Sequence, residues 1–162
     1  MEDIDRFAAL MEQEYASLLR VATVIVADEG MAREIVQEAF TRALLRWRQV
    51  SRYERPGAWL RLVTVRLATR AASKRRRDGV GLAIPDAAAF DRPADADLAA
   101  AIAVLPLAER TVVVLHYLCD EPIEKVAKTV RARPGTVRVR LHRARARLAT
   151  AMTEEKNDVP AA

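Results

Sequence analysis

The feature that most constrains this chain is the segment from residue 121 to residue 148, EPIEKVAKTVRARPGTVRVRLHRARARL. Its Glu121-Pro122 start is typical of a helix, because proline at the first helical position has no N–H to leave unpaired. Residues 131–134 interrupt the helical spacing of the apolar residues, and Gly135-Thr136 then begins a second helix. The segment therefore predicts two helices joined by a tight turn.

The second of these helices combines one apolar stripe with a dense set of cations. At about 100° per residue, its apolar residues fall on a single line: Val137, Leu141, Ala144 and Leu148. Five arginines and a histidine occupy the two flanks of this stripe, while Val139 and Ala146 point away from it: Arg138, His142 and Arg145 on one flank, and Arg140, Arg143 and Arg147 on the other. From residue 125 to residue 149 there are nine cations and no acid.

A solvated basic helix is the alternative explanation for such a run of charge. Solvated helices usually alternate Glu with Lys or Arg, because opposite charges four residues apart stabilise the helix. That alternation is missing here. A helix with one buried stripe and cations on its other faces instead fits the major groove of DNA, where arginine forms paired hydrogen bonds with guanine. We therefore expect this segment to bind nucleic acid.

Charge alternates in blocks along the 162 residues. The net charge is −6 over residues 1–40, +11 over 41–77, −7 over 78–124, +9 over 125–149 and −2 over 150–162. Two separate basic blocks with an acidic stretch between them predict contact with one polyanion at two places.

Helical spacing also dominates the N-terminal part of the chain. It predicts a helix over residues 4–27, a second over about 31–47 with Asp28 as its N-cap, and a third over about 58–76. Half of the chain is apolar, aromatic residues are few, and the high content of Ala and Leu favours helices over sheets. We expect an all-α protein whose first domain, residues 1–77, contains a basic third helix.

Residues 78–94 are rich in glycine, proline, alanine and aspartate without sustained periodicity, and they predict a flexible linker. Helical spacing resumes over residues 95–104, breaks at Leu105-Pro106 and resumes over 107–118. Together with the two helices of the basic segment, these elements are expected to form a second small helical domain, residues 95–153. We expect the polar residues 154–162 to be a disordered tail.

The chain offers little material for catalysis or metal binding. Its one cysteine, Cys119, and one of its two histidines, His116, lie in the apolar run VVVLHYLC and are expected to be buried. A Gly-rich phosphate loop and ligand-like spacing are both missing, so we expect no enzyme activity, no cofactor and no metal site. The sequence has no apolar run of membrane-spanning length and no signal-peptide start, which predicts a cytoplasmic protein without membrane insertion.

Three stretches of the chain, in this order, resemble the extracytoplasmic-function group of alternative sigma factors of bacterial RNA polymerase. They are residues 32–40 (AREIVQEAF), Ala58-Trp59-Leu60 with the basic helix that follows, and residues 105–148, which include GTVR and RLHRA. The resemblance covers roughly residues 5–150. It implies that the first domain is a sigma domain 2 and that the second is a helix-turn-helix sigma domain 4.

The resemblance also implies roles for individual residues. The first stretch would bind the coiled coil of the polymerase's largest subunit, through Glu34, Gln37, Glu38, Phe40 and Thr41. The basic helix of the first domain would bind and help to melt the minus-10 promoter element, through Trp59, Arg61, Arg66 and Arg70, although at its position Trp59 is more often a core residue. The helix-turn-helix would read the minus-35 element through Arg138, Val139, His142 and Arg143, with Arg133, Arg145 and Arg147 on the DNA backbone and Thr136 as a further contact.

Partners follow from the same resemblance: the coiled coil and the flap of core RNA polymerase, promoter DNA, and the anti-sigma protein that commonly inhibits family members. The chain differs from the usual pattern at Arg66, where asparagine is frequent, at Arg70, where aspartate is common, and at Arg131, where the turn usually has glycine. Arg66 and Arg70 predict tighter binding of DNA phosphates, and Arg131 predicts a positive φ angle in the turn.

A free-standing helix-turn-helix transcription regulator is the alternative hypothesis for this chain. Such a regulator would bind duplex DNA without polymerase. It would need neither the acidic face of the second helix nor a second basic helix, and both features therefore argue against it.

Overall fold

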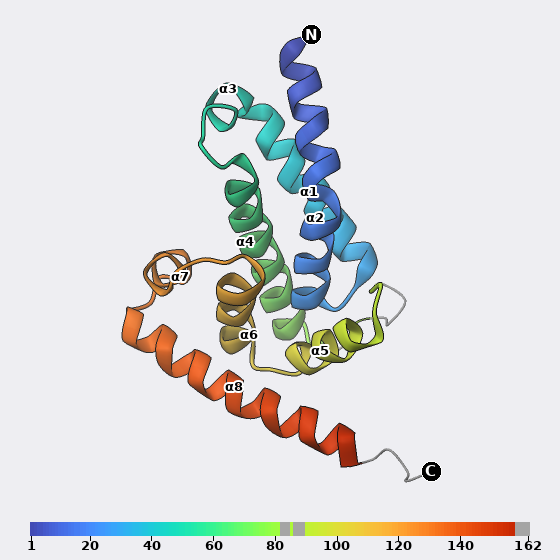
Figure 1. Ribbon diagram of the computed structural model, residues 1–162, viewed down its shortest axis with the longest axis vertical. Helices are drawn as coiled ribbons and strands as arrows, with labels where there is room; N and C mark the ends of the chain where they lie inside the picture. The colour runs from blue at the N-terminus through green and yellow to red at the C-terminus, as the bar shows by residue number, and fades with distance from the viewer. Residues whose placement is uncertain (82–84, 86–89, 158–162) are drawn as a thin grey trace.

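The computed structural model describes residues 1–81, 85 and 90–157. Within them the chain is helical and contains no strand, which confirms the expected all-α class. The elements in chain order are α1 (Glu2–Val26), α2 (Glu29–Leu45), the short α3 (Trp47–Val50), α4 (Pro56–Arg77), α5 (Pro93–Ala103), α6 (Leu107–Val113), the π-helical turn η2 (Val114–Leu118), α7 (Ile123–Val130) and α8 (Pro134–Asn157). In Figure 1, α1, α2 and α4 form the upper part of the molecule, and α8 crosses beneath α5 and α6.

Local signals in the sequence position the first three long helices. Helix α1 is followed by Ala27 as its C-cap, whose left-handed φ of 55° turns the chain. The side chain of Asp28 then accepts a 2.9 Å hydrogen bond from the backbone N–H of Met31, which confirms the expected N-cap of α2. Helix α4 begins with Pro56 at its first turn. The three helices bury a shared apolar core: Leu18, Val21, Ile25, Ile35, Val36, Ala39, Phe40, Leu60, Val63 and Ala68.

The start of α4 approaches α1 closely at Gly57. A Cβ atom on Gly57 would meet the carboxylate of Glu14, so any larger residue fits there only if that side chain moves. The carboxylate of Glu14 is buried and lies 3.2 Å from Nη2 of Arg61, one turn further along α4. This ion pair and the glycine together fix the register of α4 against α1.

The helix-turn-helix of the basic segment forms as expected. Helix α7 ends at Arg131, which adopts the left-handed φ of 55° and ψ of 46° that its place in the turn predicts. The apolar stripe of α8 is buried at Val137, Leu141 and Ala144. Helix α8 continues to Asn157, four residues past the end expected at 153, and the rest of the expected tail, residues 158–162, lies outside the described residues.

The expected helix over residues 107–118 changes its winding in its last turn. From Val114 onwards the helix widens to η2, and the N–H of Cys119 donates a 3.0 Å hydrogen bond to the carbonyl of Val114. Nδ1 of His116 lies 2.8 Å from the carbonyl oxygen of Glu121 and is paired with it. With this wider turn, polar groups at the end of the helix form hydrogen bonds with the segment that leads to α7.

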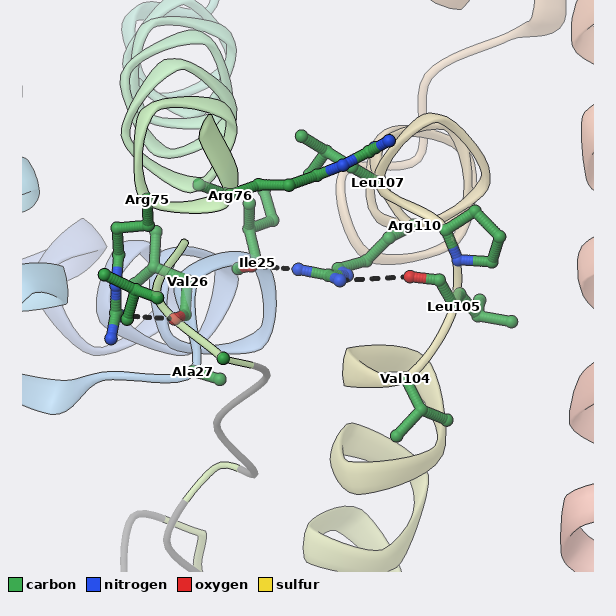
Figure 2. Close-up of a pocket in the computed structure, with 13 residues that line it drawn as sticks. Ile25, Val26, Ala27, Arg75, Arg76, Val104, Leu105, Leu107 and Arg110 are labelled. Atoms are coloured by element: carbon green, nitrogen blue, oxygen red, sulfur yellow. Dashed lines mark hydrogen bonds between the residues drawn. The ribbon is translucent and has the colours of Figure 1, made fainter. Parts of the chain in front are cut away.

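The two halves of the chain pack together across one continuous core, which the sequence did not predict. Helices α1 and α4 contact α5, α6 and η2. In Figure 2 the guanidinium of Arg110, on α6, reaches between the carbonyl oxygens of Ile25 and Leu105. Nearby, the hydroxyls of Thr69 and Thr111 lie 3.3 Å apart across the same junction.

Part of the expected linker that joins the two halves, residues 78–94, lies outside the described residues. The flexibility expected of residues 82–84 and 86–89 concerns residues that the structure does not describe. At Phe90, however, the linker is attached to the protein, because this side chain packs against the core.

Candidate nucleic-acid interface

One basic and aromatic pocket lies on α4, where the end of α2 approaches it. It has a volume of about 310 Å³, and its α4 side is formed by Trp59, Val63, Arg66 and Arg70. The ring of Trp59 is half-buried, with its centroid 6.5 Å from that of Tyr53, while Arg66 and Arg70 are exposed. Trp59 thus packs against the core and also lines the surface pocket. An aromatic wall with guanidinium groups beside it is the combination by which proteins hold single-stranded nucleic acid.

Arg61 does not join this pocket, contrary to the grouping with Arg66 and Arg70 that the resemblance implied. Its side chain turns toward α1 and pairs with the buried Glu14 carboxylate. Leaving that carboxylate unpaired would be costly, because a buried charge without a partner is strongly destabilising. Arg61 therefore helps to position α4 through its Nη2, and its role in DNA binding stays a prediction.

The second candidate surface is the outer face of α8. Thr136, Arg138, Val139, His142 and Arg143 are all exposed on this face, and Val139 is 48% exposed. This matches the orientation predicted from the helical wheel. The guanidinium of Arg138 lies 3.7 Å from the carboxylate of Glu124 on α7, with both side chains open to solvent.

Two arginines expected on the DNA backbone are held by protein partners. Nε of Arg145 donates a 2.5 Å hydrogen bond to the hydroxyl of Tyr117, and its guanidinium lies 5.7 Å from the centroid of that ring. Arg147 lies 3.1 Å from the buried carboxylate of Glu109, while its own side chain is 58% exposed. Sequence spacing carried no signal for these pairs, because each partner lies on a different helix. Arg133 is exposed at the turn before α8.

A third surface is the acidic face of α2. Glu34, Gln37, Glu38 and Thr41 are exposed on it, and Glu38 pairs with Arg42 at 2.7 Å within the helix. Phe40 differs from the expectation that grouped it with them. Its ring is only 4% exposed and packs edge-on against Phe7, with centroids 6.3 Å apart. Phe40 therefore supports the face from beneath.

The last feature of the candidate site concerns side chains that could react or bind a metal ion. Cys119 is buried, and burial raises the pKa of its thiol to about 12, which keeps it protonated and unreactive near neutral pH. Across the residues with described positions, no group of three or more His, Cys, Asp or Glu side chains is placed to hold a metal ion. The same part of the chain has no helix long and apolar enough to cross a membrane.

Comparison with known proteins agrees with the two-part organisation. The sigma-70 region 2 family matches residues 10–78, and the sigma-70 region 4 family matches residues 95–148. An RNA polymerase sigma-E factor of Streptomyces antibioticus is 31% identical over 151 residues, covering 90% of this chain and 84% of that protein. The chain belongs to the extracytoplasmic-function sigma factors of the sigma-70 family.

Other members of this sigma factor family extend the comparison. A probable extracytoplasmic-function RNA polymerase sigma factor of Mycobacterium tuberculosis, SigI, is 31% identical over 164 residues, and the chain spans only 56% of its length. The fold is shared with the sigma factor RpoE of Bartonella quintana, solved in complex with the anti-sigma factor NepR. That likeness has a TM-score of 0.70 at 20% identity, and it covers 91% of this chain and 97% of the other.

Proposed function

We propose that this sigma factor binds bacterial core RNA polymerase and directs transcription initiation at promoters that it recognises through a minus-10 and a minus-35 element. It has no catalytic chemistry of its own in this proposal, and it acts in the cytoplasm, where the polymerase works. The observation that carries the proposal is the presence of two separate basic surfaces, one on α4 and one on α8, on a single chain of this family.

The pocket on α4 is the proposed site for the minus-10 element. Its volume of about 310 Å³ is at the lower end of small-molecule pockets, and in our proposal it receives one unstacked base of the non-template strand. Trp59 supplies the stacking surface, and Arg66 and Arg70 contact the phosphates on either side. Arginine at both positions favours backbone contact, which carries less sequence information than contact with bases.

The outer face of α8 is the proposed reader of the minus-35 element. Arg138 and Arg143 have the fork of donors that pairs with guanine, His142 can contact a base edge, and Val139 is placed to touch a thymine methyl group. Arg145 and Arg147 keep their protein partners and contact phosphates with the remaining donors of their guanidinium groups. Arg133 and Thr136 contact the backbone at the entry of the helix.

The acidic face of α2 is the proposed contact with the coiled coil of the polymerase's largest subunit. Glu34, Gln37, Glu38 and Thr41 offer carboxylate, amide and hydroxyl groups on one exposed face of an otherwise basic domain. Such a face selects a partner of opposite charge and speeds encounter with it. The second domain would bind the polymerase flap, as the family resemblance implies.

Promoter binding in this proposal requires the two domains to separate. The two elements lie about 25 base pairs apart, which is roughly 85 Å of duplex at about 3.4 Å per pair. In the compact arrangement, Arg66 of α4 and Arg140 of α8 line one cleft. Residues 78–94, fully extended at about 3.5 Å per residue, span roughly 60 Å, and the widths of the domains supply the remaining distance.

An inhibitory protein is the last proposed partner. The solved relative that shares this fold is bound to the anti-sigma factor NepR. We propose that a protein of this kind holds the present chain away from the polymerase until a signal releases it. Pull-down from cells of the source organism, with the Glu38→Lys variant alongside, would identify such a protein and show whether it uses the polymerase-binding face.

The first test of the proposed function is co-elution of the purified chain with bacterial core RNA polymerase, followed by run-off transcription on genomic fragments. We expect a stable complex and new promoter-dependent transcripts. Failure to assemble, together with tight and salt-sensitive binding to duplex DNA alone, would instead support the free-standing regulator.

A further inference from the structure

A second basic cleft lies at the junction of the two domains, and no role described above uses it as a whole. It has a volume of about 500 Å³ and is bounded by α4, α6, the end of α7 and α8. Arg66, Arg70 and Arg76 line it from the first domain, and Arg131 and Arg140 line it from the second. The bonded hydroxyls of Thr69 and Thr111 lie on the same wall.

The charge of this cleft is unbalanced. No acidic residue is among those that line it, and its five arginines form no ion pair with any residue whose position is described. Some other arginines are paired, as Arg61 is with Glu14 and Arg147 is with Glu109. Like charges held close together repel, so the closed arrangement would gain from an anion with several negative groups.

We propose that this cleft binds a small oligophosphate, two or three linked phosphate groups that are either free or carried by a nucleotide. Guanidinium groups pair with phosphate oxygens in a fork geometry, and each phosphate group can accept from more than one of them. The volume of about 500 Å³ lies within the range of small-molecule pockets.

A DNA strand fits these observations less well than a small ligand does. The five arginines face one cleft only while the two domains are packed together, because three of them come from the first domain and two from the second. Promoter binding separates the domains, so a strand that follows α4 would leave Arg131 and Arg140 behind. A small ligand that bridges arginines of both domains would instead hold the closed arrangement.

The ligand would thereby regulate the proposed activity. Arg66 and Arg70 line both the cleft and the pocket on α4. An oligophosphate in the cleft engages them and keeps them from the minus-10 strand. This consequence rests on the proposed promoter function, whereas the anion site itself does not.

Two residues allow the site to be removed without touching the proposed DNA contacts. Arg131→Gly removes a guanidinium and relieves a φ of 55° that glycine adopts freely. Arg140→Gln removes a second guanidinium and keeps a residue that favours helices. The control pair is Arg48→Gln with Arg52→Gln, which removes the same charge from exposed positions in and just after α3, away from the cleft.

The test is calorimetric titration of the full chain with inorganic tripolyphosphate and, separately, with GTP at low ionic strength. We expect one site on the wild type, affinity at least about tenfold weaker in the Arg131→Gly/Arg140→Gln variant, and affinity within about twofold of the wild type in the control. Tighter binding of GTP would show that a nucleoside contributes, and equal binding would assign the site to phosphate alone. No binding by the wild type, unchanged binding by the cleft variant, or equal weakening in the control would overturn the proposal.

A second measurement separates this proposal from the promoter function. A mixed-sequence single-stranded oligonucleotide is expected to bind the wild type and the cleft variant equally, and tripolyphosphate is expected to displace it from the wild type only. Weaker oligonucleotide binding by the cleft variant would make the cleft part of the strand groove and overturn the proposal. If the oligonucleotide binds neither protein while tripolyphosphate binds as expected, the minus-10 assignment fails and the anion site stands.

Discussion

Nη1 of Arg110, on α6, donates a 2.6 Å hydrogen bond to the carbonyl oxygen of Ile25, near the end of α1 (Figure 2). Its Nη2 donates a second bond, of 3.0 Å, to the carbonyl oxygen of Leu105. Burial lowers the pKa of this guanidinium, because its charge is taken out of water. One buried side chain of the second domain thus satisfies the backbone at the end of a helix of the first.

Replacement of Arg110 by methionine is expected to lower the free energy of unfolding. The two carbonyl oxygens would lose their donors in a buried place, which costs about 1–3 kcal/mol. Urea unfolding followed by circular dichroism measures the change. The exposed Arg48→Met variant should leave the midpoint unaltered, and an equally stable Arg110→Met protein would show that the junction does not depend on these bonds.

Replacement of Gly57 by alanine is expected to destabilise the first domain by about 1–3 kcal/mol, as overpacking of a close contact does. The new Cβ would lie 2.2 Å from the Glu14 carboxylate and force it away from Arg61. Gly135→Ala is the matched control, because nothing lies within 4 Å of a Cβ at that position. Thermal unfolding of both variants checks this, and equal melting temperatures would contradict it.

Reversal of charge at Glu38 is expected to abolish binding to core RNA polymerase and to leave the fold intact. The carboxylate of Glu38 is exposed, and its only ion pair among the described residues is with Arg42 in the same helix. Size-exclusion chromatography with core polymerase measures the binding. Glu12→Lys introduces the same charge on an exposed position of α1 and should still co-elute; normal assembly of Glu38→Lys would refute the docking face.

Truncation of Arg138 to alanine is expected to reduce discrimination between the cognate and a scrambled minus-35 duplex by about 1–3 kcal/mol, as loss of a paired guanine contact does. Arg133→Ala should weaken binding to both duplexes by the same factor, because a phosphate contact carries no sequence information. Fluorescence anisotropy at fixed salt measures both. An equal loss on the two duplexes in Arg138→Ala would make Arg138 a phosphate contact as well.

The thiol of Cys119 is expected to make stability fall with pH above about 9. Burial raises its pKa to about 12 in the folded chain, so between the ordinary value of about 8.5–9 and 12 only the unfolded chain loses the proton. In that window the free energy of unfolding falls by up to about 1.4 kcal/mol per pH unit because of this one group. Below the window, the full contribution of the thiol to stability is present. Comparison of urea unfolding of wild type and Cys119→Ala at pH 8 and pH 10.5 isolates it; a constant difference would argue against the shift.

The helices and the surface of α8 could be predicted from the sequence, because both depend on local periodicity. Asp28 caps α2, Arg131 takes a positive φ, and Val139 and His142 face solvent as the helical wheel indicates. Boundaries at helix ends were less accurate, as α8 runs to Asn157 and the end of the 107–118 helix widens to a π turn. Those ends depend on hydrogen bonds to other segments.

The sequence by itself determined the all-α class, the two basic blocks and the family to which the chain belongs. The tertiary structure alone decided which arginines have a carboxylate partner on another helix. Arg61 pairs with Glu14 and Arg147 with Glu109, whereas Arg66, Arg70, Arg76, Arg131 and Arg140 line one cleft. The physical reason is that charge counts and periodicity depend on near neighbours in the chain, while ion pairs depend on distances between helices, and those are set only when the two domains pack.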